Sequence, residues 1–367
     1  MTDQAAVRMP PQYSPEQQSP ATRVRDPFMD NAKYLAVALV VCGHTWGTMA
    51  WHSKAVTAAY ELVYTFHMPV FVVITGFLSR SFTGRPDQWK RLLTGVVVPY
   101  LVVQVLFSVW VNALSDSWTP IRMLTPLYHL WFLPALFVWR MTTPLWKALR
   151  PSAGLTLAVA LCLVAGTYPL GATLDLPRVL QFMPYFVLGL HLRPQYFARL
   201  RASRAARPLA LLVFAAAGAA IYLRGTDQNL SWLMRHFDHQ SLHVSYPRWM
   251  LDNLALAAAA LVLGIAFLAL VPTRRTWFTA LGSRSLYAYL LHPFVTYGGT
   301  LLHWWSPEFW WTPLGEIVLT VIAFSLATIL SLGFVQRVLR PVLEPRLPWL
   351  FARTELAVAE LRDETRR

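Results

Sequence analysis

Long apolar segments recur along almost the whole chain and constrain its fold more than any other feature. Since a membrane-spanning helix needs about 20 mostly apolar residues, ten of these segments can be read as membrane crossings. Because isolated strands cannot satisfy their backbones in lipid, each crossing is expected to be a helix. The sequence therefore predicts an all-α, polytopic membrane protein with about ten transmembrane helices. They cover residues 31–50, 58–79, 91–112, 126–146, 153–170, 176–192, 208–223, 249–271, 284–303 and 313–335.

Basic residues are distributed unevenly between the two sides of this map. The tails and alternate connections on one side hold 26 of the 32 Lys and Arg residues. Basic residues accumulate on the cytoplasmic side of membrane proteins, so both termini are predicted to be cytoplasmic. The same rule explains the net charge of +14 without a nucleic-acid partner. We expect a multi-pass protein of the inner (plasma) membrane that contacts the lipid bilayer and binds no nucleic acid.

The two ends of the chain differ in composition from the apolar region. Residues 1–27 are polar and rich in Pro and Gln, with no apolar core of a signal peptide, and predict a disordered cytoplasmic tail. Residues 28–340 are expected to form one transmembrane domain. Residues 341–367 predict a cytoplasmic tail, either solvated or folded as an amphipathic helix. Cys42 and Cys162 lie in apolar segments and are expected to be buried free thiols.

Histidines inside apolar segments are candidates for a functional site, because ionisable groups are costly in hydrocarbon. His44 follows Lys33 by 11 residues, so the two share a helix face with a rise of about 16 Å between them. Asp30 precedes Lys33 by three residues and is close enough to pair with it. His67 is expected at the same depth as His44 on the return segment. The two histidines predict a common site; alternatively, each only hydrogen-bonds to a neighbouring helix.

Two later segments add imidazole and aromatic side chains. His129 and Trp131 lie near the predicted outer end of the fourth segment, where an interfacial aromatic belt would also explain the tryptophan. In the ninth segment, Ser285, Tyr289 and His292 share one helix face. This face is expected either to line the same cavity or to pack against a neighbour.

Two polar stretches suggest ligands with less specificity. Arg80, Arg85, Lys90 and Arg91 could bind a phosphorylated cofactor, although the cytoplasmic bias of basic residues would place them there without any ligand. A predicted outer loop carries a group of possible metal ligands, but their spacing matches no strong metal signature. We therefore expect no metal. These loop residues are His236, Asp238, His239 and His243.

Together these residues resemble the acyltransferase 3 family of integral membrane acyltransferases, particularly its fucose 4-O-acetylase-like branch. The most specific part is an acid, a basic residue three positions later, and a histidine after ten intervening residues. In this chain they are Asp30, Lys33 and His44. The stretches "FHMPVFVVITGFL", "HLWFLPALF" and "SLYAYLLHPF" resemble later landmarks of the family. The resemblance implies ten core helices, an acyl-CoA donor taken from the cytoplasm, commonly acetyl-CoA, and a carbohydrate or glycolipid acceptor.

The resemblance also implies roles for residues. It makes His44 the central catalytic residue, supported by Lys33 with Asp30. The family often has two arginines separated by two residues ahead of the third segment. Arg91 matches the first of these, but Thr94 stands at the second, so Lys90 or Arg80 is expected to substitute in binding the donor.

O-acyl transfer is the leading functional hypothesis. His44 would act as general base, and His67 would orient it or polarise the thioester. His129, Trp131, Tyr289 and His292 are assigned to the acceptor. A covalent acyl-histidine intermediate remains an alternative within this class. A secondary transporter with a midplane histidine proton site, or a membrane sensor or scaffold without catalysis, would be alternatives outside it.

Overall fold

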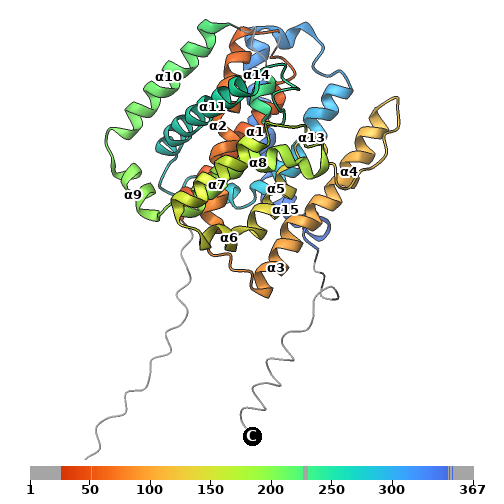
Figure 1. Cartoon of the computed structure of the whole chain (residues 1–367). Helices are drawn as coiled ribbons and strands as arrows, with labels where there is room; N and C mark the ends of the chain where they lie inside the picture. The colour runs from red at the N-terminus through yellow and green to blue at the C-terminus, as the bar shows by residue number, and fades with distance from the viewer. Residues whose placement is uncertain (1–25, 51, 226–229, 346, 348, 350–367) are drawn as a thin grey trace, which may run out of the picture.

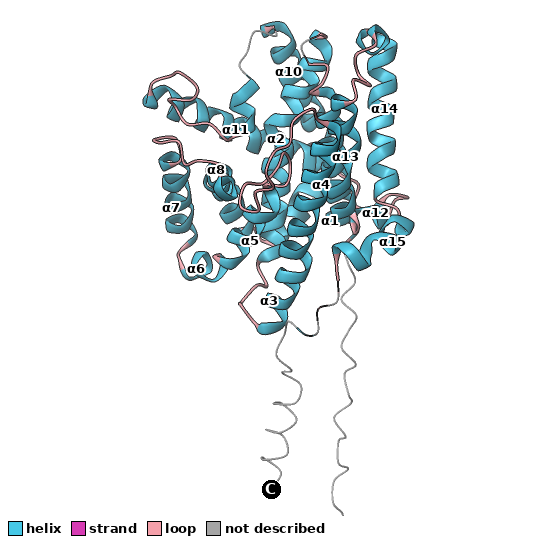
Figure 2. Ribbon diagram, turned by 90° about the vertical axis from the view of Figure 1, so that its right-hand side faces the viewer, coloured by secondary structure: helices cyan, strands magenta, loops and turns pink. Residues whose placement is uncertain are grey.

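The computed structural model describes residues 26–50, 52–225, 230–345, 347 and 349, and every regular element in these ranges is helical (Figures 1 and 2). The α-helices are α1 (Pro27–Trp46), α2 (Lys54–Ser79), α3 (Pro86–Leu92), α4 (Val98–Leu114), α5 (Phe132–Met141), α6 (Thr143–Ala148), α7 (Pro151–Val164), α8 (Leu176–His191), α9 (Pro194–Ala202), α10 (Ala206–Arg224), α11 (Tyr246–Leu270), α12 (Thr279–Gly282), α13 (Ser285–Leu301), α14 (Pro313–Leu330) and α15 (Gly333–Leu343). A π-helical turn, η1 (Leu93–Val97), joins α3 to α4, and the short 3₁₀ turns are η2 (Thr173–Asp175), η3 (Leu230–Met234) and η4 (Glu308–Trp311).

The all-α class is confirmed for the described residues, and a helix occurs within each of the ten predicted segments. Five helices are long and apolar enough to cross a membrane by length and composition: α2, α3 through α4, α10, α11 and α14. Helices α5 and α7 are apolar but shorter. The number of crossings and the cytoplasmic position of the termini therefore stay predictions.

Two predicted segments are divided differently in the structure. In the fourth, residues 126–131 are not helical, with turns at 128–131, and the remainder is split between α5 and α6 at Thr142. In the tenth, α14 ends at Leu330 and α15 begins after Leu332, whose backbone is extended. Helix α15 also extends to Leu343, beyond the predicted domain end at residue 340. The predicted tail at 1–27 lies outside the described residues up to residue 25, and so does most of the predicted C-terminal amphipathic helix.

Helices α2 and α8 pack together at the centre of the molecule. A Cβ atom added to Gly76 of α2 would lie 2.2 Å from the Phe186 carbonyl oxygen of α8. A Cβ added to Gly189 of α8 would lie 2.2 Å from the Val73 carbonyl oxygen. The two glycines therefore allow the backbones to approach closely, as small residues do between membrane helices. Helix α2 also contacts α1 and α11, while α10 packs on α11 and α2 at the edge (Figure 1).

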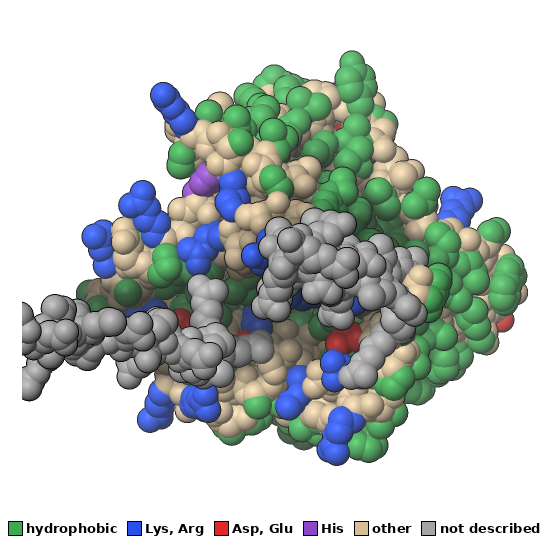
Figure 3. Space-filling view, turned by 90° about the horizontal axis from the view of Figure 1, so that it is seen from below, with side chains coloured by type: hydrophobic (Ala, Val, Ile, Leu, Met, Phe, Trp, Pro, Cys, Tyr) green, Lys and Arg blue, Asp and Glu red, His purple; other side chains and the backbone are tan. Residues whose placement is uncertain are grey.

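Helices α3, α6 and α15 lie at the lower end of the molecule in both ribbon views (Figures 1 and 2). Viewed from below, this end carries scattered Lys and Arg side chains around an apolar rim (Figure 3). These helices lie in, or next to, connections or tails that the sequence predicts to share one side of the membrane. The structure thus brings to one end the elements that the charge pattern assigns to the cytoplasm.

Candidate active site

A cavity of about 350 Å³ lies between α1, α2, α8, α13 and the turn that precedes α5. Five predicted site residues line it: His44, His67, His129, Trp131 and Tyr289. Three elements distant in sequence therefore bring imidazole side chains to one enclosed volume. Its lining also includes residues that the sequence interpretation did not single out, namely Tyr60, Tyr64, Tyr128, Arg178 and Tyr297.

His44 makes a side-chain hydrogen bond to Tyr128. Its Nδ1 lies 2.7 Å from the tyrosine hydroxyl, and the two ring centroids are 4.7 Å apart. The turn holds Tyr128 at φ = 52°, a left-handed conformation that is uncommon for a bulky residue. Such strained residues cluster at functional sites. Tyr128 could not be found from the sequence. A left-handed turn position is usually recognised by a glycine, and here it is occupied by a tyrosine.

Helix α2 and helix α13 fix the orientation of one imidazole each. Nδ1 of His67 lies 2.8 Å from the Val63 carbonyl oxygen, and Nδ1 of His292 lies 2.9 Å from that of Ala288. A carbonyl can only accept, so each Nδ1 must carry the proton. In the neutral ring Nε2 is then an acceptor. The Nε2 of His292, which is 0% exposed, has no hydrogen-bond partner in the described part of the chain.

His292 on α13 does not line the cavity, but its ring lies beside those of two histidines that do. The His292 ring centroid lies 5.1 Å from that of His44 and 5.2 Å from that of His129. The Tyr289 hydroxyl donates a hydrogen bond to the His129 carbonyl. His129 is 2% exposed, and neither of its ring nitrogens has a hydrogen bond of normal geometry to a described residue. Ser285, on the same predicted face, is buried but does not line the cavity.

Trp131 lines the cavity and is 7% exposed, packed within the protein. Its ring stacks on Phe182 with 5.1 Å between centroids, and the guanidinium of Arg178 lies 5.3 Å from its ring centroid. In the part of the chain that the structure describes, Arg178 on α8 is the one Arg or Lys side chain that lines this cavity. It could have been found from sequence, because it is an ionisable residue within the sixth predicted segment.

Arg178 is held by groups at the start of α8 and in η3. Its guanidinium pairs with the Asp175 carboxylate, and its Nε donates to the Met234 carbonyl over 2.8 Å. The other Asp175 oxygen accepts from Nδ1 of His236 at 2.7 Å. Burial alone would raise the pKa of Asp175, but the His236 hydrogen bond and the charge of Arg178 lower that pKa below its ordinary value. The cluster fixes a positive charge at the cavity wall.

Asp30 and Lys33 form the predicted pair at the start of α1, with 2.8 Å between Lys33 Nζ and Asp30 Oδ1. They do not line the cavity around His44. Helix α12 packs tightly here, since a Cβ added to Gly282 would lie 1.8 Å from the Asp30 carbonyl oxygen. The structure therefore places this pair about three turns of helix from His44 and not in contact with it.

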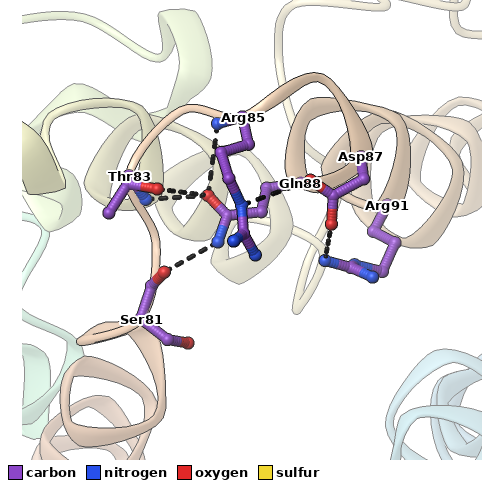
Figure 4. Close-up of polar contacts among 6 residues, drawn as sticks. All are labelled: Ser81, Thr83, Arg85, Asp87, Gln88 and Arg91. Carbon is purple, nitrogen blue, oxygen red and sulfur yellow. Dashed lines mark hydrogen bonds and ion pairs between the residues drawn. The ribbon is translucent and has the colours of Figure 1, made fainter. Parts of the chain in front are cut away.

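The predicted donor-binding residues lie around the connection between α2 and α3 (Figure 4). Gln88 organises this connection: its Oε1 accepts from the Thr83 backbone N–H at 2.7 Å, and its Nε2 donates to the Ser81 carbonyl at 2.7 Å. Asp87 pairs with Arg91 at 2.5 Å and with Arg85 at 3.4 Å. The basic loop is therefore partly neutralised by its own acid.

Two further basic residues contact the chain at or next to Arg80. Nε of Arg80 donates to the Phe77 carbonyl at 2.7 Å, and Nζ of Lys147 donates to the Arg80 carbonyl at 2.9 Å. Arg140 of α5 donates to the hydroxyl of Ser79 at 3.2 Å. Arg140 and Lys147, which the sequence interpretation did not select, thus lie beside Arg80. Lys90 on α3 accepts at its carbonyl from Thr94. None of these residues lines the histidine cavity.

The possible metal ligands of the outer loop have separate partners. His239 Nδ1 donates to the Gly166 carbonyl at 2.8 Å, while Asp238 accepts from Ser241 and from the Gln240 backbone. His236 pairs with Asp175, as described above. Within the described ranges, no group of three His, Cys, Asp or Glu side chains could hold a metal ion.

Comparison with known proteins identifies one family. A family model described as an acyltransferase domain matches residues 26–335, which include every residue that lines the cavity. No curated protein and no solved structure gives a significant match. The matched range covers most of the chain, and several of its helices are apolar enough to cross a membrane. The chain therefore belongs to the acyltransferase 3 family (Acyl_transf_3) and is a membrane acyltransferase.

Proposed function

We propose that the protein moves an acyl group, commonly acetyl, from cytoplasmic acyl-CoA to a hydroxyl of a carbohydrate-type acceptor, as in the fucose 4-O-acetylase-like branch of the family. The observation that carries this proposal is the His44–Tyr128 hydrogen bond of 2.7 Å within a cavity surrounded by imidazoles. It supplies a base with a fixed orientation, which is the group that activates a hydroxyl nucleophile.

The proposed reaction uses His44 as general base. When its Nδ1–H donates to the Tyr128 hydroxyl, Nε2 carries the lone pair. Nε2 takes the proton from the acceptor hydroxyl while that oxygen attacks the thioester carbonyl carbon. The C–S bond then breaks, the ester forms, and the CoA thiolate leaves and takes the proton from Nε2. The base returns to its neutral state at the end of the cycle.

The neighbouring imidazoles suit a polyhydroxylated acceptor. Neutral His67, which lines the cavity, offers Nε2 as a hydrogen-bond acceptor. Sugar hydroxyls supply the complementary donors. His67 cannot donate to a thioester oxygen from this tautomer, so we assign it to binding the acceptor and not to polarising the donor. The charge of Arg178 is better placed to stabilise the oxyanion that develops during attack.

The donor's phosphates are proposed to bind at the lower end of the molecule. Arg80, Arg140 and Lys147 lie together there, and Lys90 and Arg91 are on the adjacent helix α3. Basic side chains of this kind bind phosphate by charge and hydrogen bonding. The donor's extended arm would then run past Lys33 toward His44.

The test is the variant His44→Ala, with purified protein and radiolabelled acetyl-CoA. Removing a general base costs about 10²–10⁴-fold, so CoA release and ester formation should fall by that factor. Gel filtration and thermal unfolding check that the variant remains folded. Wild-type turnover in His44→Ala would remove His44 from the mechanism. Intact mass spectrometry of the wild-type protein after acetyl-CoA alone distinguishes the acyl-histidine alternative, which predicts a stable or transient gain of one acetyl group on His44.

A further inference from the structure

A second cavity lies beside the catalytic one. It has a volume of about 480 Å³ and is bounded by α2, α10, η3 and α11. Leu233 of η3 lines both cavities. On α2, Tyr60 and Tyr64 line the catalytic cavity, while the residues that follow each of them, Glu61 and Thr65, line the second. The two volumes are therefore neighbours that share a wall.

The second cavity is polar at one end and apolar along the rest. Arg224 at the end of α10, with Arg248 and Asp252 near the start of α11, forms its polar end. From there its walls are Ala217, Leu263 and other apolar residues. The eleven-residue separation between Asp252 and Leu263 corresponds to about 16 Å of helix. This shape and polarity match an amphiphile with a polar head and an apolar chain.

Glu61 indicates what kind of head the cavity accepts. Its side chain is only 5% exposed, and its Oε2 pairs with Arg224 at 2.5 Å. Its Oε1 has no hydrogen-bond partner among the residues that the structure describes. A buried carboxylate oxygen without a donor is costly, and a ligand hydroxyl would satisfy it. The cavity thus combines an unsatisfied acceptor, a guanidinium and an apolar channel.

The position of α10 gives an amphiphile access from the bilayer. This helix packs on α11 and α2 at the edge of the molecule, and leucines on its other side are exposed (Figure 1). Its central run, "AAAGAA", has small side chains that leave room beside α11. A molecule already dissolved in lipid could therefore reach the cavity without crossing water.

We propose that the α2–α10–α11 cavity binds the apolar chain of a membrane-anchored, hydroxyl-bearing acceptor, whose polar head extends past Leu233 toward His44. The acceptor class is therefore an amphiphilic alcohol, such as a sugar joined to a single long alkyl chain. This inference rests on the proposed function for the step at His44, but the binding of the amphiphile itself does not.

The probe is dodecyl glucoside with a photoreactive diazirine near the end of its chain, used with the full-length protein in phosphatidylcholine nanodiscs. Mass spectrometry of digested protein is expected to find label on the α10 and α11 residues of the cavity. An excess of unlabelled dodecyl glucoside should suppress this labelling at least about tenfold more effectively than methyl glucoside. A second probe with the diazirine on the sugar is expected to label Tyr60 or Tyr64.

Matched variants separate the cavity from the surrounding lipid surface. Ala217→Phe fills the cavity and should reduce labelling about tenfold, whereas Ala216→Phe, on the exposed side of the same helix, should not. Ala255→Phe and Ala258→Phe form the same comparison on α11. Glu61→Gln should weaken labelling by the glucoside probe, whereas a dodecane diazirine without a head group should give no saturable label on these residues.

Three results would overturn the amphiphile site. They are labelling that no competitor suppresses, equal labelling of Ala217→Phe and the wild-type protein, and the same labelling by the headless dodecane probe. Sugar-probe label that never reaches Tyr60 or Tyr64 would overturn the link to the acceptor. Acetyl-CoA turnover in the same nanodiscs reports the proposed function separately. Saturable labelling without turnover dependent on His44 would remove the acyl transfer and leave the site, while turnover without saturable labelling would do the reverse.

Discussion

At the scale of single residues, the site depends on which nitrogen of each imidazole carries the proton. The backbone carbonyls of Val63 and Ala288 settle this for His67 and His292, because a carbonyl accepts and never donates. For His44 the partner is a hydroxyl, which can do either. The functional consequence is that Tyr128 orients the proposed base without fixing its tautomer, and this role can be tested separately from the base itself.

Replacing Tyr128 by Phe should lower kcat by about 10–100-fold. The hydroxyl's hydrogen bond to an imidazole that becomes charged is worth about 1.5–3 kcal/mol, and each 1.4 kcal/mol is a factor of ten. The aromatic ring is retained, so the packing around the turn should survive. Steady-state acetyl transfer measures the effect, with Tyr168→Phe, an exposed tyrosine outside the cavity, as the control. An unchanged kcat in Tyr128→Phe would exclude a role in orienting His44.

Asp175 should contribute to stability in a pH-dependent way. Its pKa is lowered in the folded protein, so its stabilising effect is complete above the ordinary value near 3.9 and is lost as the pH falls through the lower folded value. Asp175→Asn should therefore reduce the free energy of unfolding by about 1–3 kcal/mol at pH 7. The difference from wild type should narrow below about pH 4.

Thermal unfolding in detergent at pH 7 and at pH 3.5 measures this difference. Asp116→Asn, at an exposed position in the connection after α4, is the control and should match wild type at both values. A gap between Asp175→Asn and wild type that stays constant down to pH 3.5 would contradict the assignment of the effect to the carboxylate.

Single residues also show what the sequence could and could not predict. His44, His67 and Tyr289 were predictable, because imidazole and phenol groups within apolar segments stand out. Arg178 carried the same signal and was overlooked. Tyr128 gave no signal of its own, since its left-handed backbone is imposed by the turn and not by a glycine. Leu233 lines both cavities, which residue spacing cannot predict because it depends on how the helices pack.

At the scale of helices, the extent of an apolar segment predicted the bounds of the helix well where that helix is continuous. Residues 249–271 and 284–303 correspond to α11 and α13 within a few residues. The fourth segment failed because its first residues turn before α5 begins at Phe132, and this turn is what delivers Tyr128 and His129 to the cavity. The departure from a regular helix is thus tied to the candidate site.

The close contact of α2 and α8 should be sensitive to a single methyl group. In Gly189→Ala the new Cβ would meet the Val73 carbonyl oxygen at 2.2 Å and the Phe77 nitrogen at 3.0 Å. Both atoms are backbone, so the helices would have to separate, at a cost of about 1–3 kcal/mol. Thermal unfolding in detergent is the measurement. Gly218→Ala on α10, whose Cβ would be 3.7 Å from a leucine side chain, should unfold like wild type. Equal unfolding of Gly189→Ala and Gly218→Ala would show that the α2–α8 contact is not tight in solution.

At the scale of the whole molecule, hydropathy and charge give different numbers of crossings. Among the described residues, length and composition identify five helices that could cross alone, while the asymmetry of Lys and Arg favours ten crossings. The two agree if helices such as α1, α8 and α13 are shielded by protein. These helices contribute the polar side chains of the cavity, and α8 and α13 are interrupted by proline. A helix surrounded by others does not need a uniformly apolar surface.

Ten crossings predict which connections react with a membrane-impermeant maleimide in intact cells. The wild-type protein should give little background, because Cys42 and Cys162 are buried. Cysteine at Ser117 or Ser306 should be labelled from outside, and cysteine at Ser152, Ser203 or Ser283 only after the cells are opened. All five serines are exposed, so a lack of reaction reports sidedness and not burial. If Ser152 and Ser203 react on opposite sides, α8 and its neighbours do not cross as pairs. The map of ten crossings would then be wrong, and the proposed passage of the acyl group from the donor-binding loop to His44 would have to be rebuilt.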